Sequence, residues 1–171
     1  MAVLVAGCGL FGDDLTEPGR SAPEILVVTS PAFQDGAAIP RRFTCRAEGA
    51  SPPLVWTGVP ADAEALAVVV SDPDAPGGTY VHWVVLDLDP SADSIQEAAV
   101  PTGARQARNS AGRARYDPPC PPSGTHRYRF TVFALRTASG LPDGTDTDRA
   151  LDAIDARTVG RGTLVGTVDA T

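Results

Sequence analysis

Short apolar runs, interrupted by proline and glycine, restrict the folds that this chain can adopt. The 171 residues include 17 glycines and 16 prolines, which break helices and favour turns. The longest apolar runs, Ala65–Val70 and Trp83–Leu86, have the length of strands and are far shorter than the ~18–20 residues that cross a bilayer. A long helical bundle or coiled coil is therefore excluded, and a single domain of many short strands is favoured.

Stretches rich in β-branched and aromatic residues predict the strands of this domain. The expected strands are Ile25–Thr29, Ile39–Thr44, Leu54–Trp56, Ala65–Ser71, Val81–Leu88, Arg127–Leu135 and Gly162–Val168. One helix is expected from Thr147 to Ile154, because Leu151 and Ile154 lie one turn apart, and Arg157 and Gly160 suit its end. Many strands and few helices indicate an antiparallel sandwich, or an α+β domain dominated by sheet.

Charge and motif content exclude several functional classes. The formal net charge is −7 at pH 7, so a phosphate backbone would be repelled and nucleic-acid binding is not expected. The sequence contains no H-E-x-x-H, G-x-S-x-G or paired C-x-x-C motif, which are signatures of zinc proteases, serine hydrolases and zinc or redox sites. No cofactor is therefore expected.

The N-terminus resembles a bacterial lipobox, in which a cysteine receives a diacylglycerol. Leu4–Cys8 combines aliphatic and small residues with a final cysteine, although the preceding signal segment is much shorter than usual. Residues 1–8 are thus interpreted as a truncated signal with lipidation at Cys8, residues 9–23 as a flexible linker, and residues 24–171 as the domain. This layout predicts an exported protein, lipid-anchored to the outer face of the cytoplasmic membrane. The alternative is a chance apolar N-terminus.

The cysteine count agrees with this interpretation. The chain has three cysteines, and a lipidated Cys8 would leave Cys45 and Cys120 as a pair. In an oxidising compartment these two could form a disulfide that closes a long loop. The alternative is two separate thiols, because the sequence alone does not show that the cysteines meet.

Two rigid loops each lead to one of the chain's two histidines. Ser71–Gly78 contains D-P-D-A-P and precedes the strand with His82, so a hairpin could place His82 beside Asp72. Pro118–Gly124 (P-P-C-P-P-S-G) precedes the strand with His126. Each loop alone could be an ordinary turn and each histidine an ordinary packing residue, but their joint occurrence favours a site.

These stretches resemble the signatures of the phosphatidylethanolamine-binding proteins (PEBPs), most closely the bacterial and archaeal branch called Raf-kinase-inhibitor-like. The matching segments are D-P-D-A-P, G-G-T-Y-V-H-W, P-C-P-P-S-G-T-H-R-Y, S-P-A-F, I-P-R-R-F-T-C, S-P-P-L-V-W and G-T-L-V-G-T, and they span about residues 25–168. The resemblance implies a mainly β fold, with a large antiparallel sheet on a smaller one and a C-terminal helix near residues 147–158.

The resemblance also implies a small surface pocket for phosphate, a phosphoryl headgroup or a similar anion. The implied pocket residues are Asp72, His82 and His126, with Pro76, Tyr80, Tyr116, Gly124 and Tyr128 lining or shaping it. Asp117 and Pro118 depart from the glycines usual in this branch, so a backbone donor could be missing and a repulsive charge added. Arg157 and Thr158 stand where the family's helix often carries a histidine.

The expected function is non-catalytic binding of a small anion, which protonated imidazoles would favour. Phosphate affinity should then fall as pH rises past the histidine pKa, about 6.5 when unperturbed. Two alternatives stay open: the histidines and Asp72 could bind a metal or support acid–base hydrolysis, or the domain could inhibit a partner protein such as a secreted protease. A cytosolic kinase is not an expected partner of an exported protein, and a homodimer is suggested by the resemblance alone.

Overall fold

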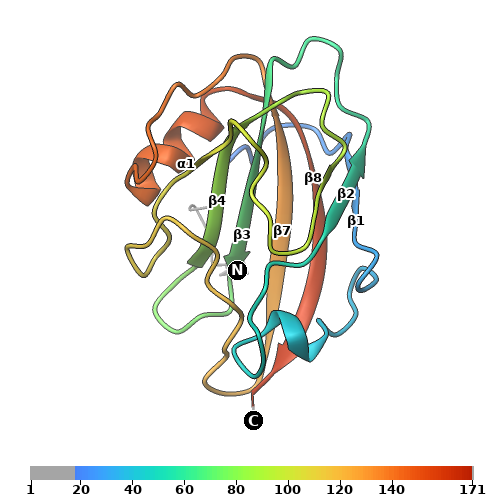
Figure 1. Cartoon of the computed structure of the whole chain (residues 1–171), viewed down its shortest axis with the longest axis vertical. Helices are drawn as coiled ribbons and strands as arrows, with labels where there is room; N and C mark the ends of the chain where they lie inside the picture. Colours follow the sequence, from blue (N-terminus) through green and yellow to red (C-terminus); the bar gives the residue numbers. More distant parts are fainter. Residues whose placement is uncertain (1–17, 171) are drawn as a thin grey trace, which may run out of the picture.

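The computed structural model describes residues 18–170 and shows two antiparallel sheets packed face to face (Figure 1). The larger sheet has the strand order β6-β4-β3-β7-β8, and the smaller has the order β1-β2-β5. The strands are β1 (Val27–Thr29), β2 (Leu54–Thr57), β3 (Ala65–Asp72), β4 (Tyr80–Leu88), β5 (Ser94–Ile95), β6 (Arg105–Gln106), β7 (Thr125–Leu135) and β8 (Thr158–Asp169). The predicted sandwich of a large and a small sheet is confirmed.

β3 lies at the centre of the large sheet, and every one of its residues is buried. Alternate side chains face opposite sides of a strand, so β3 contributes to two cores. Leu66 and Val70 belong to the core beneath the small sheet, whereas Ala67 and Val69 belong to the core beneath the helix. This double burial explains why the strand is a continuous apolar run rather than an alternating one.

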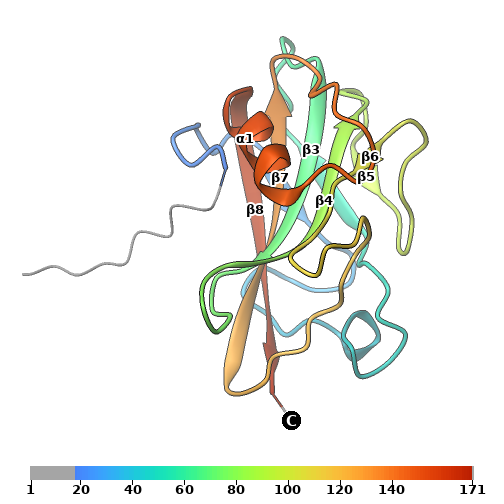
Figure 2. The same cartoon turned by 90° about the vertical axis from the view of Figure 1, so that its left-hand side faces the viewer.

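The single α-helix of the described chain, α1 (Thr147–Asp155), covers the other face of the large sheet (Figure 2). Of the expected pair Leu151 and Ile154, Ile154 is fully buried against that face and Leu151 only partly, while Ala150 is the second fully buried residue. The predicted extension of the helix to residue 158 is wrong, because β8 begins at Thr158 and pairs with Leu135 of β7. Within residues 18–170, no helix is long and apolar enough to cross a membrane.

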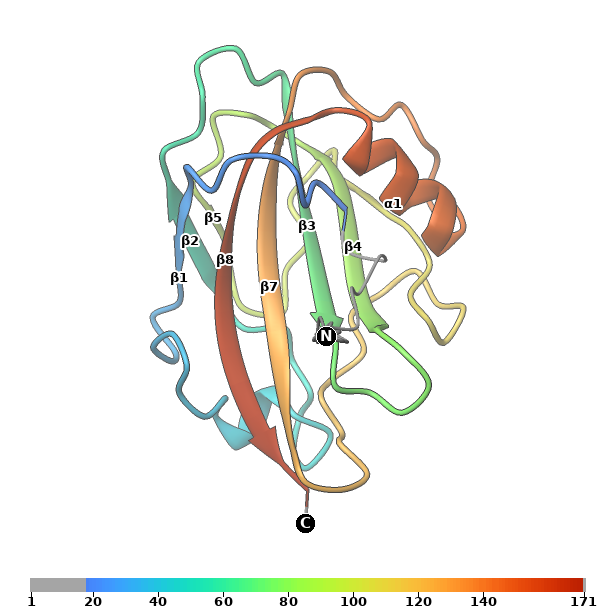
Figure 3. The same cartoon turned by 180° about the vertical axis from the view of Figure 1, so that it is seen from behind.

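Glycines in β8 allow the N-terminal segment to cross this edge strand closely (Figure 3). The backbone N–H groups of Ile25 and Leu26 both donate to the Arg161 carbonyl oxygen, at 3.0 Å. A Cβ atom on Gly162 would lie 2.1 Å from the Leu26 carbonyl oxygen, and one on Gly160 would lie 2.4 Å from Ile25 Cδ1. Only glycine leaves room for such a close approach of backbone to backbone.

The expected strand at Ile39–Thr44 is wrong, because this stretch contains a 3₁₀ helix, η1 (Arg41–Phe43). Pro40 has a φ of −57°, which suits the start of a helix, and it has no N–H to donate to a strand. The Phe43 N–H donates to the Pro40 carbonyl at 2.9 Å, and the Phe43 ring is fully buried. Ile39 makes only an isolated backbone hydrogen bond to Thr167 of β8.

The predicted lipidation at Cys8 and most of the predicted linker at residues 9–23 fall outside the described residues. Cys8 and the linker up to residue 17 lie in that part of the chain. The last linker residues, 18–23, contact the domain, since the Gly19 N–H donates to Asp155 Oδ1 at 2.8 Å and Pro18 is buried. The boundary at residue 24 stays a prediction.

Candidate functional site

A cavity of about 280 Å³ opens where β3 ends and β4 and β7 begin. Its lining comes from the two loops that the sequence singled out and from the strands that follow them. The lining residues are Asp72, Ala75, Pro76, Tyr80, His82, Asp117, Pro118, Cys120, Pro121, Pro122, His126 and Tyr128. The structure therefore brings Asp72, His82 and His126 together at one cavity, although they are far apart in the sequence.

Asp72 orients His126 rather than His82. The His126 Nδ1 lies 2.7 Å from Asp72 Oδ2, and both side chains are buried, with 5% and 4% of their surface exposed. The β3–β4 hairpin does bring His82 and Asp72 to the same cavity, but the Asp72 carboxylate accepts from His126 on β7 instead of from His82. The Asp72 Oδ1 accepts from the Asp74 N–H at 2.9 Å, which closes the turn after β3.

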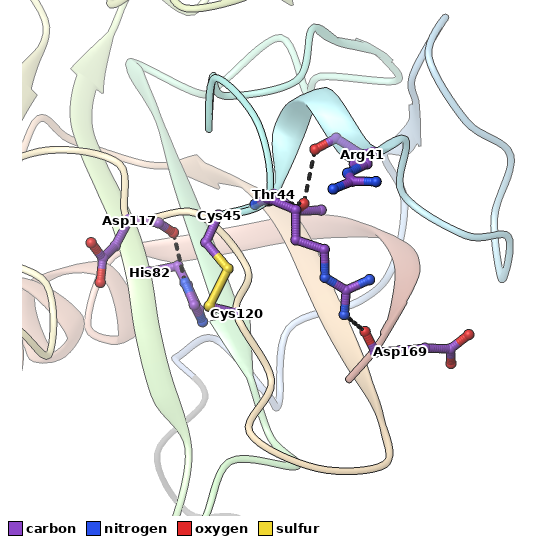
Figure 4. The surroundings of a disulfide bond; sticks show 8 residues. Arg41, Thr44, Cys45, His82, Asp117, Cys120 and Asp169 are labelled. Atoms are coloured by element: carbon purple, nitrogen blue, oxygen red, sulfur yellow. Dashed lines mark hydrogen bonds between the residues drawn. A yellow bond between two sulfur atoms is a disulfide. The ribbon is translucent and has the colours of Figure 1, made fainter. Parts of the chain in front are cut away.

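His82 is held by the loop that precedes β7. Its Nδ1 lies 2.7 Å from the Asp117 carbonyl oxygen, and the Asp117 N–H donates back to the His82 carbonyl at 2.9 Å (Figure 4). A carbonyl oxygen can only accept, so Nδ1 carries the hydrogen and Nε2 is left for other partners. The ring packs against Tyr80 and Tyr128, with centroids 4.7 and 5.2 Å away. Burial lowers the pKa of His82, despite the opposing effects of Asp117 and Asp72, so the neutral imidazole is favoured at pH 7.

Asp117, which departs from the family pattern, is a paired carboxylate and not a bare charge. The Tyr80 hydroxyl donates to its Oδ2 at 2.7 Å, and Arg113 Nη2 donates to its Oδ1 at 2.5 Å. Burial and the Asp117 carboxylate raise the pKa of Tyr80 to about 12, which keeps the hydroxyl protonated. The repulsion expected from Asp117 is therefore reduced by Arg113, which lies outside the lining.

A second ion pair joins the loop after β3 to the start of β7. Asp74 accepts from the backbone N–H, Nε and Nη2 of Arg127, at 2.8, 2.9 and 2.6 Å. These side-chain hydrogen bonds lower the pKa of Asp74 to about 2. Asp74 lies two positions after Asp72, and Arg127 lies one position after His126. The ion pair therefore helps to hold the buried Asp72 and His126 side chains in contact.

Two of the residues carried over from the family do not line the cavity. Tyr116 packs edge-on against Trp83, with ring centroids 5.7 Å apart, and burial raises its pKa. Gly124 forms the turn before β7 with a φ of +67°, a conformation that glycine adopts most easily. Pro76, Tyr80 and Tyr128 do line the cavity.

Sequence reasoning missed part of the lining. Ala75, Pro121 and Pro122 were not proposed, although they lie within the loops that were. Asp117 and Pro118 enter the sequence analysis only as departures from the family. Treating each rigid loop as a continuous wall finds four of these five residues, because Asp117 lies one position before the Pro118–Gly124 loop.

The Cys45–Cys120 disulfide fixes one wall of the cavity. Its sulfur atoms are 2.09 Å apart and its cysteines are separated by 75 positions in the sequence. It joins the segment after η1 to the proline-rich loop (Figure 4). The Cys45 N–H also donates to the Pro119 carbonyl at 3.0 Å. Cys120 itself lines the cavity, so the covalent link acts directly on its shape.

The residues of this site, as far as the chain is described, form no cluster of three or more His, Cys, Asp or Glu side chains suited to a metal ion. The chemistry available is that of two imidazoles, each fixed through Nδ1, beside two hydrogen-bonded carboxylates. Such groups can bind a small ligand through Nε2 and can exchange protons with it.

Comparisons with known proteins agree with this architecture. The family model described as "Phosphatidylethanolamine-binding protein" matches residues 29–169. A Mycobacterium tuberculosis protein described as "Putative lipoprotein LppC" is 40% identical over 185 residues, which cover 99% of this chain and 92% of the relative. The crystal structures of the PEBP homologue CT736 from Chlamydia trachomatis (35% identity) and of YbcL from E. coli (28% identity) each have a TM-score of 0.81, covering 86% of this chain and 99% of theirs. This chain belongs to the phosphatidylethanolamine-binding protein family.

Proposed function

We propose that this domain is a non-catalytic binding protein whose cavity takes a small anion, either phosphate or a phosphoryl headgroup. The observation that carries this proposal is the convergence of His82 and His126 on one cavity, each with Nδ1 engaged and Nε2 left for a ligand. A neutral imidazole accepts through Nε2 from the hydroxyl of a protonated oxyanion, and a protonated imidazole donates through Nε2 to the anion as a charge-assisted donor. The volume of about 280 Å³ suits a headgroup rather than a whole lipid.

The binding site can be tested by removing one imidazole. His126→Ala is expected to weaken the binding of inorganic phosphate at pH 6 by about tenfold or more, since a hydrogen bond to a charged group contributes about 1.5–3 kcal/mol. Isothermal titration calorimetry measures this loss. Ser123→Ala is the matched control, because Ser123 lies in the same loop but does not line the cavity. Equal affinities for the wild type and His126→Ala would contradict the proposal.

We also propose that the protein is lipid-anchored in the cell envelope through Cys8. Two observations support this: the lipobox-like Leu4–Cys8 segment, and the 40% identity to LppC, which is described as a lipoprotein and aligns with 99% of this chain. A disulfide in the domain also suits an exported protein.

The anchor can be tested by labelling with a palmitate analogue in a bacterial host that carries the lipoprotein pathway. The wild type should incorporate label and sediment with membranes, whereas Cys8→Ser should do neither, because its hydroxyl cannot be lipidated in this pathway. Cys45→Ser with Cys120→Ser is the control for a general effect of cysteine loss and should keep the label. An unlabelled wild type would contradict the anchor and leave the binding proposal standing.

Inhibition of a protease and homodimer formation stay predictions from the family resemblance. Neither is needed for the binding proposed above.

A further inference from the structure

Three side chains of the cavity wall direct their polar hydrogen atoms at protein acceptors. The described lining has four side chains with a hydrogen on nitrogen or oxygen when the imidazoles are neutral: Tyr80, His82, His126 and Tyr128. Tyr80 donates to the Asp117 carboxylate, His82 to the Asp117 carbonyl, and His126 to the Asp72 carboxylate. Of these four side chains, only Tyr128 then has a donor hydrogen to offer to a ligand.

Four of the twelve lining residues are prolines, which removes their main-chain donors from the wall. Pro76, Pro118, Pro121 and Pro122 have no N–H. Apart from the Tyr128 hydroxyl, the side chains offer acceptors to a ligand, namely the Nε2 atoms of the two imidazoles and the oxygens of two carboxylates. At the neutral imidazoles a fully deprotonated anion would meet lone pairs, which repel it.

The charged groups around the imidazoles decide whether the protein itself supplies the missing proton. His82 faces Asp117, Asp72 and His126, with Arg113 paired to the far side of Asp117. His126 faces Asp72 and, further out, Asp74, which is neutralised by Arg127. The carboxylates favour a second proton on the imidazoles, but burial opposes it and lowers the pKa of His82.

We propose that the cavity selects oxyanions that carry their own acidic proton, such as the monoprotonated forms of phosphate or of a phosphate monoester. In such a complex the P–OH group donates to Nε2 of one neutral imidazole. Sulfate has the same tetrahedral shape but no proton at neutral pH, so it requires proton uptake by the protein. This inference rests on the proposed function, since it specifies the ligand class of the same site.

The test compares inorganic phosphate with sulfate by calorimetry at several pH values between 5 and 8. At pH 7 phosphate is expected to bind at least about tenfold more tightly, because each pKa unit of unfavourable protonation weakens binding about tenfold. The ratio should shrink toward pH 5 as the imidazoles take up protons and no longer need one from the ligand. Titrations of sulfate in buffers of different ionisation enthalpy should show proton uptake on binding.

Glutamine variants provide an independent check. In His82→Gln and His126→Gln the side-chain amide places a permanent N–H donor near the position of Nε2, so the preference for phosphate at pH 7 should decrease. Thermal melts show whether each variant is folded. If neither variant folds, the pH series on the wild type tests the preference for protonated oxyanions by itself.

The possible outcomes separate the two proposals. Equal affinities for phosphate and sulfate, with a ratio that does not change with pH, would overturn this inference and leave anion binding intact. Absence of binding for both anions at every pH would overturn the proposed function itself. Binding of methylammonium in place of phosphate would overturn both, because it would show that the acceptor-rich wall serves a cation.

Discussion

Replacing Cys45 and Cys120 together with serine is expected to lower the free energy of unfolding by about 4 kcal/mol. The disulfide links positions separated by 75 residues, and the cross-link removes the corresponding loop entropy from the unfolded chain. Urea unfolding followed by fluorescence measures the change, with the slope of the transition checked for two-state behaviour. Stabilities range around 5–15 kcal/mol for domains of this kind, so a loss of this size is a large fraction of the total.

The same substitution should also weaken ligand binding, because Cys120 lines the cavity. Without the link, only hydrogen bonds such as that from the Cys45 N–H to Pro119 would hold the proline-rich loop to the segment after η1. Treating the wild type with a reductant should reproduce the loss of stability, and the double serine variant should not respond to the reductant. An unchanged urea midpoint in both cases would show that the disulfide does not stabilise the fold.

Gly162→Val is expected to destabilise the protein by about 3 kcal/mol, the upper range for an overpacked site. A Cβ atom at this position would lie 2.1 Å from the Leu26 carbonyl oxygen, and the obstacle is backbone rather than a flexible side chain. The N-terminal segment would have to move away from β8 and break the hydrogen bonds from Ile25 and Leu26 to Arg161. Thermal and urea unfolding measure the effect.

Thr167→Ala is the control for Gly162→Val. Thr167 lies in the same strand and is only half-buried, so its truncation should change stability by about 0.5 kcal/mol or less. If Gly162→Val were as stable as this control, the close crossing of β8 by the N-terminal segment would be wrong. Gly162→Val should have little effect on phosphate binding while the protein is folded, because Gly162 lies outside the cavity lining.

Strands with strong patterns were predictable, whereas a stretch with a mixed pattern was not. Ala65–Val70 is continuously apolar and lies in the doubly buried central strand of the sheet. Ile39–Thr44 has β-branched residues at both ends, but Pro40 starts a 3₁₀ turn that buries Phe43. Local backbone restriction by proline outweighed the strand propensity of the neighbouring residues there.

The residues of the candidate site could be proposed from the sequence because rigid loops and rare histidines stand out along a chain. Asp72, His82 and His126 were named in this way, and the two stiff loops beside them supply most of the remaining cavity wall. Composition and motif also sufficed to expect a sandwich with one helix. These properties depend on local preferences that each segment carries by itself.

The partners of the two imidazoles depend on the folded structure alone. Asp72 contacts His126 across 54 positions in the sequence, and His82 contacts the carbonyl of Asp117 across 35. The register of β3, β4 and β7 and the path of the disulfide-linked loop place these donors and acceptors within hydrogen-bonding distance. Because a hydrogen bond weakens steeply when its atoms move apart, only the packed tertiary structure decides which nitrogen of each ring is left to meet a ligand.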